Sequence, residues 1–327
     1  MAEKYDSIFI SWAPENTRSA TLAKCFGARL FNLHALGFKR VLIAPLKYLI
    51  LSARTLAIIR RERPELVFVL NPPYFSGLAV WLATRLYGGR FVLDSHTGAF
   101  LEKKWTWLAP LHRFIARRAI VSIVTNEKLG SMVESWGGHY FIIGDVPTRF
   151  EAAHIDGLPR PFVTVVNTFS YDEPIEEVVD AARSMPDVHF SVTGDLRHCP
   201  TDLKENAPPN LSFTGFVPHQ EYVNKLFSSD LAVVLTTENF TMQRGAYEAV
   251  SLDVPVVTSD WPLLRDTFSG GAKFCDNSAE GIATAVGAVL DQQPEFKRGV
   301  MELKESRRQL WATRQSEFES RYLLKAS

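Results

Sequence analysis

Short apolar runs alternate with longer helical stretches along this chain, and the alternation constrains its fold more than any other feature. The runs are rich in Val, Ile and Phe, as are strands that are buried on both faces of a sheet. Strands are expected at 7–12, 29–33, 41–44, 66–70, 91–93, 120–125, 140–143, 162–166, 189–192, 211–213, 231–235 and 254–258. Helical stretches between strands are typical of a parallel sheet that helices cover. The sequence therefore predicts an α/β fold.

The alternation stops once, in a segment rich in proline and glycine, and then restarts. A chain of 327 residues is long enough for two domains, each with its own core. We expect Rossmann-like doubly wound domains at 1–150 and 162–301, joined by a linker at 151–161, and a charged helix at 302–327 that packs back on the first domain. Two such domains imply a cleft between them, with ligands at the carboxyl ends of the strands.

Composition argues against several classes of protein. The three cysteines are far apart and form no C-x-x-C pair, which argues against a disulfide framework or a zinc site. The most apolar stretch, 41–59, contains Lys47 and Arg54, so it lacks the roughly 20 uncharged residues of a membrane span. The first residues carry mixed charge, unlike a signal peptide. We expect a reduced, cytoplasmic protein.

The net charge of zero conceals an asymmetry between the two halves. Residues 1–150 hold 20 Lys and Arg against 10 Asp and Glu, so the first half carries 20 − 10 = +10. The rest then holds 16 basic and 26 acidic residues, a charge of −10. The basic half is expected to meet something anionic, and charge alone leaves nucleic acid, a membrane surface and a phosphorylated substrate open.

Two common nucleotide-binding motifs are absent. Neither the dinucleotide fingerprint G-x-G-x-x-G nor the P-loop G-x-x-x-x-G-K-[ST] follows a predicted strand. Their absence argues against a dehydrogenase and against an NTPase.

Polar motifs follow three of the predicted strands. Asn71-Pro72-Pro73 follows one strand, Asp94-Ser95-His96 closes the next, and 167–173 (NTFSYDE) follows the first strand of the second domain. Together they resemble GT-B glycosyltransferases, in particular the eukaryotic β-1,4-mannosyltransferases that act on dolichol-linked chitobiose, with their N-P-P, D-x-H and S-T-S-x-x-x-D-E motifs. Residues 213–216 and 238–260 are similar to the donor-binding half of GT-B enzymes at large. The resemblance implies the GT-B fold and a nucleotide-sugar donor.

One departure from that pattern concerns the mechanism. Many retaining GT-B enzymes carry two glutamates separated by seven residues near the donor. This chain has Glu248, but Phe240 stands eight positions earlier, and the nearest earlier acid is Glu238. The departure favours an inverting mechanism.

The donor site must stabilise the charge of a departing diphosphate. Because no D-x-D motif closes a strand, we expect no metal and no cofactor; backbone N–H groups at a helix start in 241–245 and the side chain of Arg244 would hold the diphosphate. Glu248 would bind the ribose, unless it and Arg244 form only a surface ion pair. Phe216 is placed near the base or in the core, and Asp172 at an ordinary helix start. The expected donor-binding residues are Asn167, Ser170, Thr193, Gly194, Phe216, Val217, Thr241, Arg244 and Glu248.

An inverting transfer needs a base that takes a proton from the attacking hydroxyl. Asp94 and His96 are the candidates, since Asp94 closes an apolar strand where partial burial would raise its basicity. A strand-end aspartate is also a common turn former, and a lone histidine is often only a hydrogen-bonded neighbour. The sequence does not choose between the two residues.

Basic residues and tryptophans of the first half suggest where the acceptor and a membrane surface bind. Lys47, Arg54 and Arg61 recur every seven residues on one helix, which is typical of an interfacial membrane helix or of a solvated basic face. Arg18, after the first strand, is placed near an acceptor phosphate by position alone. The expected acceptor and membrane residues are Arg18, Lys47, Arg54, Arg61, Lys103, Lys104, Trp105 and Trp107.

The sequence thus predicts a GT-B glycosyltransferase, inverting and independent of metal, on the cytoplasmic face of a membrane. It would transfer a hexose from a GDP- or UDP-sugar bound on 162–301 to a glycan or lipid-linked glycan on 1–150, and would bind no nucleic acid. Two alternatives remain: a nucleotide-sugar 2-epimerase of similar fold, and a non-catalytic scaffold that binds nucleotide sugars.

Overall fold

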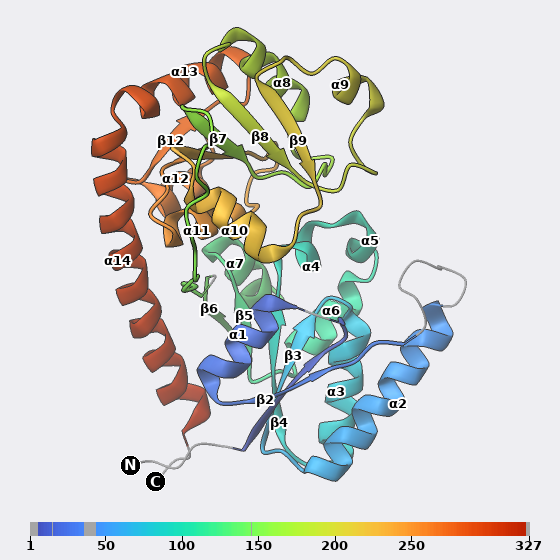
Figure 1. Ribbon diagram of the computed structural model, residues 1–327. Coiled ribbons are helices and arrows are strands. Elements are labelled where there is room, and N and C mark those ends of the chain that lie inside the picture. The colour runs from blue at the N-terminus through green and yellow to red at the C-terminus, as the bar shows by residue number, and fades with distance from the viewer. Residues whose placement is uncertain (1–5, 15, 36–43, 145, 325–327) are drawn as a thin grey trace. The chain divides into compact units, whose positions relative to one another are not determined.

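The computed structural model describes residues 6–14, 16–35, 44–144 and 146–324, with the side chain of Lys103 left out. The chain forms two compact units, Met1–Val146 with Leu310–Ser327, and Pro147–Gln309. Each unit is built on one six-stranded sheet whose pairings are all parallel (Figure 1). The predicted fold class, two doubly wound α/β units, is confirmed.

The first sheet has the strand order β2-β1-β3-β4-β5-β6. Its strands are β1 (Ser7–Ser11), β2 (Arg29–Asn32), β3 (Leu66–Asn71), β4 (Arg90–Ser95), β5 (Val121–Val124) and β6 (Tyr140–Ile142). The order reverses between β1 and β3, and in open α/β sheets ligands bind outside the carboxyl ends of the strands at such a point. The strand expected at 41–44 lies outside the described residues except for Ala44, which begins a helix.

Alternate side chains of this sheet enter two separate cores. Ile8 and Ile10 pack on one face, while Phe9 between them packs on the other. The first core is closed by α2 (Ala44–Glu62), α3 (Tyr74–Tyr87), α6 (Ala109–Ala116) and α7 (Glu127–Ser135). The second is closed by α1 (Thr17–Phe26) and by the end of the chain. Two short helices, α4 (Thr97–Leu101) and α5 (Lys103–Thr106), follow β4.

The end of the chain packs in the core of the first unit. Helix α14 (Gln293–Phe318) is followed by a π-helical turn, Glu319–Leu323. Phe318 is fully buried, and its ring centroid lies 4.9 Å from that of Phe26. Aromatic burial therefore fixes Phe318 and the turn after it to the helix-α1 face of the first sheet.

The second sheet has the strand order β12-β11-β10-β7-β8-β9. Its strands are β7 (Phe162–Val165), β8 (His189–Thr193), β9 (Leu211–Gly215), β10 (Leu231–Val234), β11 (Val256–Ser259) and β12 (Ala272–Cys275). One face is covered by α8 (Ile175–Ser184) and α13 (Ala279–Asp291), and the other by α10 (His219–Phe227), α11 (Arg244–Ser251) and α12 (Pro262–Phe268). A short helix, α9 (Thr201–Glu205), precedes β9. The order reverses between β7 and β10.

Residues 151–161, expected to be a linker, are attached to the second unit. The backbone N–H of Ala153 donates to Asn224 Oδ1 at 3.0 Å, and that of Ile155 donates to Ser228 Oγ at 2.9 Å. Phe150 and Ala152 also pack against the core beside α10. Hydrogen bonds and apolar contacts thus hold this proline- and glycine-rich segment on the end of α10.

No helix among the described residues has both the length and the apolar character to cross a membrane.

Candidate functional site

A cavity of about 590 Å³ lies at the carboxyl ends of β7, β8 and β9 in the second unit, next to the start of α11. Val234, the last residue of β10, also lines the cavity, which therefore borders the reversal of strand order between β7 and β10, the usual ligand position in an open α/β sheet. Seven of the nine expected donor-binding residues line it, namely Asn167, Thr193, Gly194, Phe216, Val217, Arg244 and Glu248. The volume is that of a typical small-molecule site.

The wall formed by β7 and β8 is shaped by hydrogen bonds within the loops. Thr193 Oγ1 donates to Val165 O at 3.2 Å and accepts from the N–H of Asn167 at the same distance. Gly194 has a φ of 129°, and a Cβ there would lie 2.7 Å from Asn167 O and from the Phe169 ring. A side chain at this position would clash with both groups, so glycine permits the close approach of the loops after β7 and β8.

Arg244 and Glu248 form the ion pair that the sequence left open, and both still line the cavity. Arg244 Nε lies 2.8 Å from Glu248 Oε1, and Tyr222 OH donates to Oε2 at 2.7 Å. Arg244 is exposed, whereas the carboxylate of Glu248 is held on both sides. Each Glu248 oxygen retains a second lone pair that a hydroxyl of a ligand can use. Sequence reasoning missed Tyr222, because it comes from α10 and no local pattern marks it.

Glu173 is a second residue of the cavity that sequence reasoning missed. Its carboxylate accepts hydrogen bonds from the N–H groups of Thr168 at 2.8 Å and Ser170 at 2.9 Å. Burial raises the pKa of Glu173, and these hydrogen bonds act in the opposite direction. The S-T-S-x-x-x-D-E resemblance contained this glutamate, but a helix start explained it equally well.

Two expected donor residues, Ser170 and Thr241, do not line the cavity. Ser170 Oγ instead donates to Asp172 Oδ1 at 2.5 Å, while Asp172 Oδ2 accepts from Thr236 Oγ1 at 2.8 Å. This network ties the loop after β7 to the end of β10. Thr241 precedes the helix, because α11 begins at Arg244 after the N-cap Gln243.

The aromatic residue expected near the base is not part of the core. Phe216 is 85% exposed and lines the cavity together with Val217. An exposed phenyl ring that lines a cavity is suited to stack on a planar ligand.

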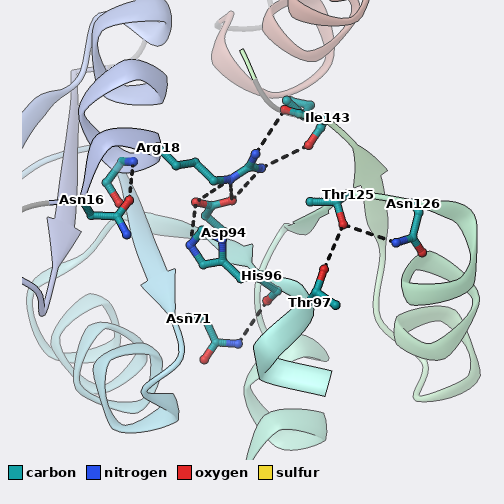
Figure 2. Close-up of polar contacts among 12 residues, drawn as sticks. Asn16, Arg18, Asn71, Asp94, His96, Thr97, Thr125, Asn126 and Ile143 are labelled. Carbon is teal, nitrogen blue, oxygen red and sulfur yellow. Dashed lines mark hydrogen bonds and ion pairs between the residues drawn. The ribbon is translucent and has the colours of Figure 1, made fainter. Parts of the chain in front are cut away.

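A second polar cluster lies in the first unit, at the carboxyl end of β4 (Figure 2). Asp94 is fully buried, and Arg18 Nε and Nη2 each lie 3.1 Å from its Oδ1. The same guanidinium donates to the backbone carbonyls of Ile143 and Gly144 at 3.1 Å. The position of Arg18 in the sequence suggested a contact with an acceptor phosphate, but in the structure its guanidinium is buried and bound to protein groups. The structure places Arg18 as the partner of Asp94, 7% exposed.

His96, unlike Asp94, reaches the surface. It is the N-cap residue of α4, its side chain is 29% exposed, and its Nε2 lies 3.9 Å from Asp94 Oδ2. The two candidates thus differ in exposure: Asp94 is enclosed, whereas the His96 side chain is partly exposed, although its Nε2 atom is buried. A general base must reach the proton that it takes, and the partly exposed imidazole makes His96 the more accessible of the two candidates.

Asn71, of the N-P-P motif, is hydrogen-bonded to this cluster. Asn71 O accepts the N–H of His96 at 3.0 Å, and Asn71 Nδ2 donates to Ser95 Oγ at 3.1 Å. Asn71 Nδ2 also lies 2.9 Å from His112 Nε2. Burial among aromatic rings lowers the pKa of His112 to about 3, so its neutral ring accepts the hydrogen bond from Asn71. The N-P-P and D-x-H motifs therefore meet in one hydrogen-bonded network.

The basic face expected on α2 is not continuous. Lys47 is 8% exposed, and desolvation lowers its pKa. It lies in the buried stripe that continues through Leu51, Thr55 and Ile59. Of the other two residues, Arg54 donates to His34 O at 2.9 Å and Arg61 pairs with Glu62 at 2.7 Å.

The residues expected after β4 differ in their exposure. Lys104 pairs with Glu102 at 2.5 Å, and the ring of Trp105 packs on Tyr74 with centroids 5.5 Å apart. Trp107 is 72% exposed. Lys103 begins α5, and its side chain lies outside the described part of the structure.

Among the described residues, no three His, Cys, Asp or Glu side chains lie close enough together to hold a metal ion.

Two doubly wound parallel-sheet units, one with a cavity at its strand-order reversal, form the architecture of the GT-B glycosyltransferases. Two family models identify the group: residues 7–139 match the glycosyl transferase 4-like domain, and 163–292 match glycosyl transferases group 1. Together they cover most of the chain, which belongs to the glycosyltransferases that carry these two domains. No curated protein matches the chain in sequence.

Solved structures show the same fold at low sequence identity. HepE of Anabaena in complex with UDP has a TM-score of 0.71 and 11% identity, over 96% of this chain and 98% of its own. A glycosyltransferase of Rickettsia africae has a TM-score of 0.68 and 11% identity, over 96% and 98%. The pneumococcal O-GlcNAc transferase GtfA, in complex with UDP and GlcNAc, has a TM-score of 0.63 and 12% identity, over 82% of this chain and 59% of its own.

Proposed function

We propose that this glycosyltransferase moves a hexose from a UDP-sugar, with a GDP-sugar as the alternative donor, to a hydroxyl of a glycan or lipid-linked glycan. The observation that carries the proposal is the cavity of the second unit, lined by Arg244, Glu248 and the loops after β7 and β8. Structural neighbours in complex with UDP and with UDP-glucose support a uridine nucleotide.

The donor is assigned to the cavity by its chemistry. Arg244 and the first N–H groups of α11 offer positive charge to a diphosphate, as a guanidinium and a helix N-terminus do together. Glu248, oriented by Tyr222, accepts from the ribose hydroxyls, and Phe216 stacks on the base. This assignment needs neither metal nor cofactor, and undiminished turnover in the presence of EDTA is the expected result.

The first unit supplies the base in this proposal. His96 takes the proton of the attacking hydroxyl, and Asp94, fixed by Arg18, orients the imidazole. Because Phe240 replaces the first glutamate of the retaining pair, we propose inversion at the anomeric carbon. The anomeric signals in the ¹H NMR spectrum of the product test this, and a product with the anomeric configuration of the donor would contradict both inversion and the base role of His96.

The acceptor and its place in the cell follow from the first unit as well. Its basic charge and the exposed Trp107 support a lipid-linked acceptor and a peripheral position on the cytoplasmic face of a membrane. The test compares transfer to a soluble glycan with transfer to the same glycan on a polyprenyl diphosphate in vesicles. Faster transfer to the lipid-linked form is expected, and equal rates would contradict membrane association.

The first experiment measures melting temperatures with UDP, GDP, TDP, NAD and common sugar nucleotides. A ligand that binds the native state raises the melting temperature, so one nucleoside diphosphate should stand out and name the base. The matching sugar nucleotide is then assayed for transfer to candidate acceptors. Stabilisation by NAD alone, or by none of the ligands, would contradict the donor assignment.

A further inference from the structure

A second cavity, of about 540 Å³, lies in the first unit at the amino-terminal end of β4. Arg85 of α3, Arg90 at the start of β4 and Arg118 after α6 all line it. None of its eight lining residues is acidic; the other five are Trp81, Thr84, Gly89, Phe91 and Ile120. Three guanidinium groups in one cavity repel one another, so an anion bound among them gains from all three.

The side chain of Arg118 is held by a hydrogen bond and by aromatic rings. Its Nη1 donates to Phe114 O at 2.9 Å, and its guanidinium lies 3.5 Å from the centroid of the Phe114 ring and 5.6 Å from that of Trp81. Stacking on aromatic rings orients the planar guanidinium and leaves its remaining N–H groups available to a ligand. This is a preorganised donor group, unlike a freely rotating surface arginine.

The position of this cavity separates it from the candidate catalytic cluster. Arg90 is the first residue of β4 and Asp94 the fifth, so the two lie roughly 13 Å apart along the strand at 3.3 Å per residue. The donor cavity belongs to the other unit. Neither the donor nor the base therefore accounts for the three arginines.

We propose that this cavity, the Arg85–Arg90–Arg118 site, binds a phosphate group. Arginine forks match phosphate oxygens in bidentate geometry, and the absence of acids among the lining residues favours a ligand with more than one negative charge. The phosphate comes either from a lipid headgroup or from a soluble phosphate ester. Leu82 and Leu86, next to Arg85 on α3, are 42% and 59% exposed, which suits the lipid source.

The test compares the full-length protein with the double variant Arg85→Gln/Arg118→Gln. Arg298→Gln, on the exposed surface of α14, is the matched control with the same loss of charge per residue. One arm measures sedimentation with vesicles of phosphatidic acid in phosphatidylcholine, and with phosphatidylcholine alone. The other arm titrates inorganic phosphate and pyrophosphate in a calorimeter. Unchanged melting temperatures show that the variants fold, and Arg85→Gln alone replaces the double variant if that one does not.

Loss of two arginines near an anionic surface is expected to weaken vesicle binding roughly thirtyfold, while the control binds as wild type. In the lipid case Leu86→Gln also weakens vesicle binding and leaves phosphate binding unchanged. In the soluble case the wild type binds phosphate or pyrophosphate, ignores the vesicles, and loses that binding in the double variant. Equal binding by the double variant and wild type in both arms, or no binding by wild type in either, overturns the proposal.

Discussion

Arg18 and Asp94 form a buried ion pair between helix α1 and strand β4, with guanidinium and carboxylate side chains 5% and 0% exposed. The pair joins residues 76 positions apart, and Arg18 also donates to the two backbone carbonyls that follow β6. One guanidinium therefore connects helix α1 to the carboxyl ends of two strands of the first sheet, β4 and β6. Figure 2 shows Asp94 between Arg18 and His96, so in the proposed mechanism Arg18 acts on the candidate base through Asp94.

Arg18→Met should destabilise the first unit by about 3–5 kcal/mol, because it leaves the carboxylate of Asp94 buried without a partner. Arg18→Met combined with Asp94→Leu should recover most of this loss, since no uncompensated charge remains. Urea unfolding followed by tryptophan fluorescence measures both, and six of the seven tryptophans lie in the first unit. Strictly additive losses in the double variant would show that the two residues do not act as a pair.

His96→Ala should lower kcat by about 10²–10⁴-fold and leave the donor Kd unchanged, because a general base contributes about that much. Asp94→Asn should lower both kcat and the free energy of unfolding, since it weakens the pair with Arg18. Thr97→Ala, one residue further along α4, is the control and should retain turnover. A wild-type kcat in His96→Ala would show that His96 is not the general base.

The fold could be predicted because its signal is local. Buried parallel strands are continuous apolar runs, and β7 (FVTV) and β10 (LAVV), which are buried along their whole length, contain Thr164 as their one polar residue. The face of α2 was predicted wrongly for a physical reason. A straight helix has 3.6 residues per turn, so residues spaced by seven, such as Lys47, Arg54 and Arg61, drift gradually around it. The buried residues of α2 are instead spaced by four and include Lys47.

Site residues that directly follow a predicted strand could be predicted from the sequence. Site residues that reach the site only through tertiary contacts could not. Thr193 and Gly194 close a strand, and the cavity contains both. Tyr222 contacts Glu248 across 26 residues, and Arg18 contacts Asp94 across 76. Such contacts depend on how helices pack on the sheets, and no residue pattern near either partner records that.

Arg244→Gln should weaken the binding of a nucleoside diphosphate by roughly 10–100-fold, because it removes a hydrogen bond to charged phosphate oxygens. The affinity for the nucleoside alone should stay the same, since Glu248 retains its hydrogen bond from Tyr222. Arg183→Gln, on α8 and paired with Asp180, is the matched control. Titration calorimetry with UDP and uridine measures both affinities, and equal weakening for the two ligands would place Arg244 away from the diphosphate.

The buried ring of His112 should make the first unit sensitive to acid. Its pKa falls from an ordinary 6.5 to about 3 on folding, because burial disfavours the charged form. The unfolded chain then binds a proton more readily than the folded one, so the stability present above pH 6.5 is lost as the pH falls toward 3. The loss should reach up to about 1.4 kcal/mol per pH unit within that window.

His112→Phe tests this, because phenylalanine retains the packing against Tyr74 and Trp136 and cannot titrate. At pH 7.5 the variant should be less stable by about 1 kcal/mol, for the hydrogen bond that Asn71 loses. Between pH 6.5 and 4.5 its stability should fall less steeply than that of wild type. Tryptophan fluorescence again reports on the first unit. It is therefore insensitive to Glu173 of the second unit, whose raised pKa changes stability with pH in the opposite direction. Parallel pH profiles for variant and wild type would show that His112 does not cause the acid sensitivity.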